Sequence, residues 1–219
     1  MKKGYCEMVF ILDRSGSMHG LESDTIGGFN SMIKKQRRDG VRGTVTAALF
    51  DDRLEVPFDH SDISTVPDMT NRIYFTRGCT ALYDAVGSMI MRVENRRWKM
   101  REDEIPEKTV FVITTDGYEN SSVEFSGEKV RKLIQQKEKT GWEFLYLGAN
   151  IDAAAEAGRI GIRATHAARF HADSEGIAKN FEVLSETVSC FARCSEKTIP
   201  DAWADTIRED YRTRRTSRR

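Results

Sequence analysis

Short apolar runs alternate along the chain with amphipathic stretches, and this alternation limits the possible folds more than any other feature. The runs are typical of buried strands, whereas the stretches between them repeat apolar residues at three- and four-residue steps, as one face of a helix does. Strands interleaved with helices predict a doubly wound α/β sheet, mostly parallel, with helices on both faces. The expected strands are 8–12, 44–50, 109–114, 144–147 and 167–171, and the expected helices are 21–38, 81–98, 127–139, 152–159 and 174–193.

One further strand is expected at an edge of the sheet. Residues 54–58 (LEVPF) follow the turn-like Asp51-Asp52-Arg53, so they are expected to pair antiparallel with strand 44–50. Pro57 suits an edge strand, because its missing N–H then leaves no ladder bond unmade. The polar stretch 100–108 is interpreted as a solvated connection. We expect one domain over residues 1–195 and a C-terminal extension over 196–219.

Composition restricts the class of function. Hydrophobic residues make up 39% of the 219, which is enough to bury a sizeable core. The formal net charge is zero, which argues against nucleic-acid binding by bulk electrostatics. No apolar run approaches the roughly 20 residues needed to span a bilayer, and residues 8–12 are too short for the core of a signal peptide. These features predict a cytoplasmic protein without a membrane partner.

The cysteines and the C-terminus carry weaker signals. Cys6, Cys79, Cys190 and Cys194 form no CxxC pair, so free and mostly buried thiols are expected. Cys190 and Cys194 are four residues apart on an expected helix and could share a ligand, but two ligands do not make a zinc site.

Residues 211–219 (YRTRRTSRR) are rich in arginine. They are expected to be solvated and flexible, with binding to an acidic protein, nucleic acid or a membrane surface as the alternative.

Polar side chains gather where ligands bind in such a sheet, at the carboxyl ends of the strands. Three loops are expected to meet there: 13–18, 78–81 and 115–120. They carry Asp13, Ser15, Ser17, Thr80 and Asp116. Hydroxyl and carboxylate oxygens are the donors that hard divalent cations prefer. Asp13, Ser15 and Ser17 are two residues apart, so their side chains can project to one side of an extended or turning segment.

Each of these residues also has an ordinary structural interpretation. Ser15 or Ser17 could cap the helix expected from residue 21, and Thr80 could cap the helix expected from residue 81. Asp116 and Gly117 could form a turn only. Five such residues on one rim favour a shared site over five separate structural roles.

The motifs Asp13-Arg14-Ser15-Gly16-Ser17-Met18, GCTAL (78–82) and TTDGYEN (114–120) resemble the von Willebrand factor A (vWA) domain. Together they match its metal-ion-dependent adhesion site (MIDAS), in the family's chain order. The resemblance covers roughly residues 5–190. The segments TALYDA and LYLGAN are also similar to the small stand-alone bacterial members of the family.

The resemblance implies a set of roles. Ser15, Ser17 and Thr80 would bind the metal directly, and Asp13 and Asp116 would mostly hold its waters, while Arg14 occupies a variable position. The metal would be Mg²⁺, with Mn²⁺ or Ca²⁺ as alternatives. An aspartate or glutamate of a protein partner would complete its coordination. The implied function is a protein–protein interaction module without catalysis, a subunit or regulator of a larger assembly.

The alternative is an Mg²⁺-dependent phosphohydrolase or nucleotide-acting enzyme that uses the same site. The chain has no GxxxxGK[ST] loop, no GxSxG nucleophile elbow and no GxGxxG after its first strand. These absences argue against a P-loop nucleotide hydrolase, a serine hydrolase and a dinucleotide-binding protein. The interaction module is therefore the favoured hypothesis.

Overall fold

Six strands form one sheet in the computed structural model, which describes residues 1–217. The order across the sheet is β3-β2-β1-β4-β5-β6. Only the edge strand β3 runs antiparallel, paired with β2, and the other neighbours within the described residues are parallel. The predicted doubly wound sheet with one antiparallel edge strand is confirmed. The strands are β1 (Lys2–Asp13), β2 (Gly43–Phe50), β3 (Leu54–Asp62), β4 (Pro106–Thr115), β5 (Trp142–Ala149) and β6 (Ala167–Phe170).

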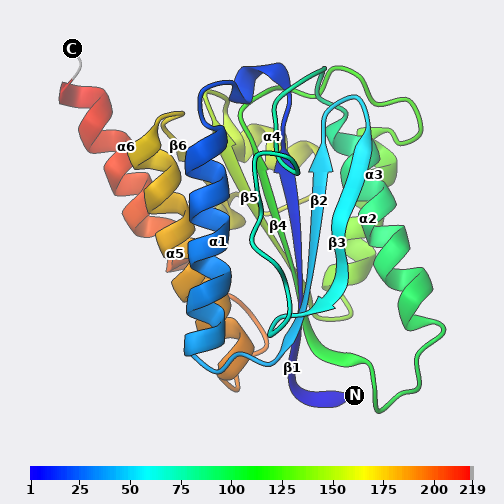
Figure 1. The fold of residues 1–219 in the computed structure, drawn as a ribbon. Coiled ribbons are helices and arrows are strands. Elements are labelled where there is room, and N and C mark those ends of the chain that lie inside the picture. Colours follow the sequence, from blue (N-terminus) through cyan, green and yellow to red (C-terminus); the bar gives the residue numbers. More distant parts are fainter. Residues whose placement is uncertain (218–219) are drawn as a thin grey trace.

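Helices cover both faces of the sheet (Figure 1), with α1, α5 and α6 on one side and α2, α3 and α4 on the other. Because successive strand residues point to opposite faces, Phe10 of β1 packs in the core under α1 and α5, and Ile11 packs in the core under α2 and α3. The central strands therefore carry apolar residues on both faces. The helices are α1 (Glu22–Arg38), α2 (Leu82–Arg97), α3 (Gly127–Glu138), α4 (Ala153–Arg159), α5 (Ser174–Arg193) and α6 (Asp205–Ser217). Short 3₁₀ turns span Gly16–Met18, Ala164–His166 and Asp201–Ala204.

The strand order reverses at the centre of the sheet and fixes the position of the site. β1 pairs with β2 on one side and with β4 on the other, and the chain enters α1 after β1 and α3 after β4. These two helices lie on opposite faces of the sheet (Figure 1). The crevice at such a reversal is where open α/β sheets bind ligands.

The C-terminal extension differs from the flexible end that its composition suggested. Residues 205–217 form α6, which packs against β6 and α5. The Tyr211 ring stacks on His171 with centroids 4.5 Å apart, and Arg214 forms an ion pair with Asp173. Residues 218 and 219 of the predicted tail lie outside the described residues.

The connection expected over 100–108 is shorter than predicted, because β4 begins at Pro106.

Two further expectations concern thiols and membranes. No cysteine of the described chain is in a disulfide bond, and Cys6 is buried as expected. Cys79 and Cys190 are exposed, so the expectation of mostly buried thiols is wrong for these two. Within residues 1–217, none of the helices combines the length and the apolar character needed to cross a bilayer.

Candidate metal site

The ends of β1 and β4 bring the first carboxylate into place. Asp13 closes β1 beside Thr115, the last residue of β4. Thr115 Oγ1 donates to Asp13 Oδ2 at 2.6 Å, and the backbone N–H of Ser15 donates to Asp13 Oδ1 at 2.7 Å. The second bond turns the chain sharply after the strand, so that both serines of the motif return towards the sheet edge.

The two serine hydroxyls face the carboxylates and do not cap a helix. Ser15 Oγ and Ser17 Oγ lie 3.0 Å apart, and Ser17 Oγ donates to Asp116 Oδ1 at 2.5 Å. Ser15 precedes the 3₁₀ turn without a side-chain capping bond, and α1 starts only after Leu21. Neither serine therefore caps a helix, which was the alternative interpretation of these two residues.

Thr80 completes the set from the loop before α2. The N-cap of that helix is Ala81, and no side chain caps it, so Thr80 is not a cap either. A Cβ built on Gly117 would lie 3.2 Å from Thr80 Oγ1 and 3.5 Å from Ser17 Oγ, so these hydroxyls border one small space that a side chain would fill. All five predicted residues are brought together beside the carboxyl ends of β1 and β4.

Side-chain bonds that the sequence analysis missed hold the Thr80 and Asp116 loops against each other. Asn120 accepts from Thr80 N at 2.9 Å and donates its own N–H to Thr80 O at 3.0 Å. Glu119 accepts from Tyr83 N at 2.9 Å, and Asp84 accepts from three successive amides, at residues 123–125. Asp84 thus ties the first turn of α2 to the loop that follows the Asp116 motif. The motif TTDGYEN contains Glu119 and Asn120, but nothing in its spacing shows what they bind.

Arg14 lies behind the site, fully buried, in the position treated as variable in the sequence analysis. Its guanidinium pairs with Asp51 and with Glu55, both at 2.8 Å, and Arg77 pairs with the same two carboxylates. Arg77 N also donates to Arg14 O at 2.8 Å. The loop that carries both serines is thereby fixed to the turn after β2 and to the segment that leads to Thr80.

The negative charge of the two carboxylates is not balanced by a positive side chain within the described residues. Asp13 is almost completely buried, and burial raises its pKa to about 6. Burial also raises the pKa of Asp116. No lysine, arginine or histidine of residues 1–217 forms an ion pair with either carboxylate. Two buried acids therefore face three hydroxyls with no cation from the chain, an arrangement that fits an external divalent ion.

The donor set also indicates which kind of ion fits. Over the part of the chain that the structure describes, no group of three or more His, Cys, Asp or Glu side chains is placed to hold a metal. A cation at this edge would depend on the hydroxyls of Ser15, Ser17 and Thr80 together with the two aspartates. Oxygen donors of this kind suit Mg²⁺, Mn²⁺ or Ca²⁺.

Comparison with solved structures identifies the fold. The vWF domain of the type V pili tip protein Mfa5 from Porphyromonas gingivalis superposes with a TM-score of 0.63 at 11% identity, over 88% of this chain and 98% of that one. The chain has the von Willebrand factor A fold. The recognition made from the sequence motifs is confirmed at the level of the vWA fold.

Other vWA structures agree. Proximal thread matrix protein 1 from the mussel byssus, in a structure with a zinc-occupied MIDAS motif, has a TM-score of 0.55 at 18% identity over 85% of this chain. The ArnB paralog VWA2 from Sulfolobus acidocaldarius has a TM-score of 0.53 at 14% identity, also over 85% of the chain. The chain spans 46% and 45% of these two proteins, less than half of each. No protein-family model and no curated protein matches the sequence.

Proposed function

We propose that this vWA-fold chain is an interaction module that binds Mg²⁺ at the carboxyl ends of β1 and β4. Through this ion it would bind an aspartate or glutamate of a partner protein. The observation that carries the proposal is the convergence of three hydroxyls and two buried carboxylates, from three loops, without a charge-balancing cation from residues 1–217. A site that only stabilised the fold would be expected to balance its buried charges internally.

Each residue has a defined part in the proposed site. Ser15, Ser17 and Thr80 would hold the ion through their hydroxyl oxygens. Asp13 and Asp116 would hold its waters and balance part of its charge. When bound, the ion supplies incompletely neutralised charge and open positions that a partner's carboxylate can fill. The bonds from Asn120, Glu119 and Arg14 keep the three loops in place before any ligand arrives.

We place this module in the cytoplasm, as part of a larger assembly. The free cysteines within the described residues are typical of a reducing compartment. The interaction function is favoured over a nucleotide-acting phosphohydrolase because the sequence has no GxxxxGK[ST] loop for nucleotide phosphates.

A thermal unfolding series tests metal binding directly. We expect Mg²⁺ or Mn²⁺ to raise the melting temperature of the wild-type chain, because an ion that binds only the folded state at 100 times its Kd adds about 2.7 kcal/mol. Ser17→Ala should lose this gain. Ser31→Ala, an exposed serine on α1, is the matched control and should keep it. The absence of a gain with Mg²⁺, Mn²⁺ and Ca²⁺ alike would contradict the proposed site.

Partner capture from the source cell tests the function. With Mg²⁺ present, the wild-type and Ser31→Ala chains should retain a protein that is lost with chelator and with Ser17→Ala. A partner that is indifferent to both treatments would overturn the metal-bridged mechanism. Hydrolysis of phosphate esters or nucleotides that depends on Mg²⁺ and is abolished by Ser15→Ala would establish the alternative enzyme instead.

A further inference from the structure

Two thiols meet at the end of α5, far from the proposed metal site in the sequence. Cys190 is in the last turn of the helix, and Cys194 is its C-cap. Their sulfur atoms are 3.2 Å apart. Cys190 is exposed and Cys194 is half-buried, so solvent and small solutes reach Cys190 first.

The backbone holds the two thiols in this position. Cys194 has already left the helical conformation, with φ −76° and ψ 164°, yet its N–H still donates to Cys190 O at 2.8 Å. The buried ammonium of Lys108 donates to Phe191 O at 2.6 Å and to Cys194 O. Lys108 thus anchors the turn that contains both cysteines, and the approach of the sulfurs does not depend on a mobile end.

There is also room for a reagent beside the thiols. A cavity of about 630 Å³ is lined by both cysteines and by the apolar side chains of Phe191, Ile199 and Trp203. The charged residues on its wall are Glu186 and Glu196, and no basic residue of the described chain lines it. Such a wall favours an uncharged, partly apolar molecule over an anionic one.

We propose that Cys190 and Cys194 form a reversible disulfide by exchange with a small neutral organic disulfide. The thiolate of Cys190 attacks one sulfur of the reagent RSSR, whose S–S bond breaks, and RS⁻ leaves and takes up a proton. The thiolate of Cys194 then attacks the Cys190 sulfur of this mixed disulfide and displaces the second RS⁻, which is also protonated. Two thiols are oxidised to one disulfide, and RSSR is reduced to two RSH that carry the two protons.

The pH dependence of the exchange follows from the same geometry. The hydrogen bond with Cys194, aided by burial, raises the pKa of Cys190 above that of an ordinary thiol. Because the thiolate is the attacking species, the reaction is slow at neutral pH and accelerates as the pH rises.

The test uses the full chain, 2-hydroxyethyl disulfide as the neutral reagent, and mass spectrometry of non-reduced peptides. Cys79 is an internal control, because it is exposed and lies apart from the contact between Cys190 and Cys194. We expect Cys79 to keep a hydroxyethylthio adduct, whereas the peptide with Cys190 and Cys194 loses two hydrogen atoms and carries no adduct. A lasting adduct on Cys190, or two reduced thiols after Cys79 has reacted completely, would overturn the proposal.

Single variants identify the two steps. In Cys194→Ser the second thiol is missing, so Cys190 should keep the adduct as Cys79 does. In Cys190→Ser the half-buried Cys194 should gain its adduct more slowly than Cys190 does in the first variant. Equal rates would contradict the assigned order of attack. Loss of the Cys190 adduct in Cys194→Ser would show that another group displaces it and would refute the role of Cys194.

Discussion

Strand β1 has two buried carboxylates, one in its middle and one at its carboxyl end, and the two are treated in opposite ways. Glu7 and Asp13 are each 1% exposed. Burial pushes the pKa of Glu7 up, but the neighbouring His60, the hydrogen bond from Arg96 and the charge of Arg97 bring it below its ordinary value. Burial raises the pKa of Asp13 to about 6, and its hydroxyl and amide donors do not reverse that rise.

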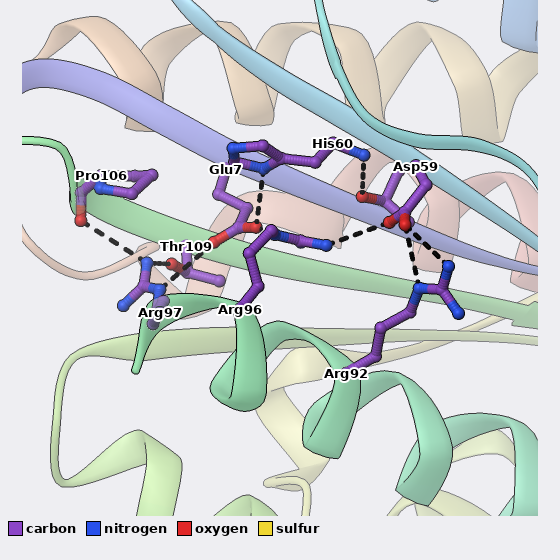
Figure 2. A network of polar contacts seen from close by, with 9 residues as sticks. Glu7, Asp59, His60, Arg92, Arg96, Arg97, Pro106 and Thr109 are labelled. Carbon is purple, nitrogen blue, oxygen red and sulfur yellow. Dashed lines mark hydrogen bonds and ion pairs between the residues drawn. The ribbon is translucent and has the colours of Figure 1, made fainter. Parts of the chain in front are cut away.

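The difference lies in the partners that the chain supplies. Figure 2 shows Glu7 enclosed by guanidinium groups, with Arg96 at 2.5 Å and Arg97 at 3.2 Å from its oxygens. Arg96 continues to Asp59, so the positive charges of this network are also paired. Within residues 1–217, Asp13 receives no such partner. The middle of the strand is therefore closed and structural, whereas its carboxyl end is open and leaves a charge for a ligand to neutralise.

The largest expected effect is at the closed middle of β1. Glu7→Gln keeps the shape of the side chain but leaves two partly buried arginines without their carboxylate. We expect the free energy of unfolding in urea to fall by about 3 kcal/mol, the lower limit for a buried pair that loses one member, because Arg96 keeps Asp59 as a partner. Glu128→Gln, at an exposed site on α3, is the control and should change it by less than about 0.5 kcal/mol. Equal losses in the two variants would mean that the Glu7 network does not stabilise the fold.

At the open end, the same chemical change should have the opposite sign. A pKa raised from 3.8 to about 6 means that the charged Asp13 destabilises the fold by about 3 kcal/mol at neutral pH. In chelator, Asp13→Asn should therefore raise the free energy of unfolding by roughly 2 kcal/mol. The new amide oxygen can accept from Ser15 N, and its NH₂ can donate to Thr115 Oγ1. Mg²⁺ should no longer raise the melting temperature of this variant. If Asp13→Asn destabilises the chelated protein as Glu7→Gln does, the Asp13 charge is balanced within the chain.

The five residues at the open end could be predicted from the sequence because their signal is local. Asp13, Ser15 and Ser17 lie in one short motif, and the strand order places Thr80 and Asp116 on the same rim. The partners of Glu7 and Arg14 could not be predicted. Glu7 meets Arg96 across 89 positions and Arg14 meets Asp51 across 37, and spacing carries no information about such contacts.

The errors in the sequence analysis have the same origin. The first strand was expected to begin at Met8, where the apolar run begins, whereas β1 begins at Lys2 and buries Glu7. The arginine-rich end was expected to be flexible because polar composition alone shows no core-facing side. Its helix is held by tertiary contacts, such as the stacking of Tyr211 on His171.

A third buried carboxylate, Glu143 on β5, sharpens the comparison through pH. One of its oxygens has no hydrogen bond, and His166 Nδ1 lies 3.6 Å from it. Burial raises the pKa of Glu143 to about 7 from 4.5, so its favourable contribution is complete below pH 4.5 and is lost as the pH rises through 7. Between pH 5 and 8, the wild-type chain should lose roughly 1–2 kcal/mol of unfolding free energy relative to Glu143→Gln. Urea unfolding across this range, in chelator, measures the difference. Parallel curves for the two chains would show that Glu143 ionises normally.

The smallest effect is expected at the outer rim of the Glu7 network. Arg92 and Asp59 form a 2.7 Å ion pair, but their side chains are 49% and 36% exposed, so water competes for both charges. Asp59 also keeps Arg96 as a partner when Arg92 is removed. Arg92→Gln should therefore lower the free energy of unfolding by about 0.5 kcal/mol, and molar salt should abolish the difference. Urea unfolding at low and high salt measures both quantities. A loss that approached the one caused by Glu7→Gln, and that persisted in salt, would place Arg92 within the closed network and extend that network from Glu7 to the surface of α2.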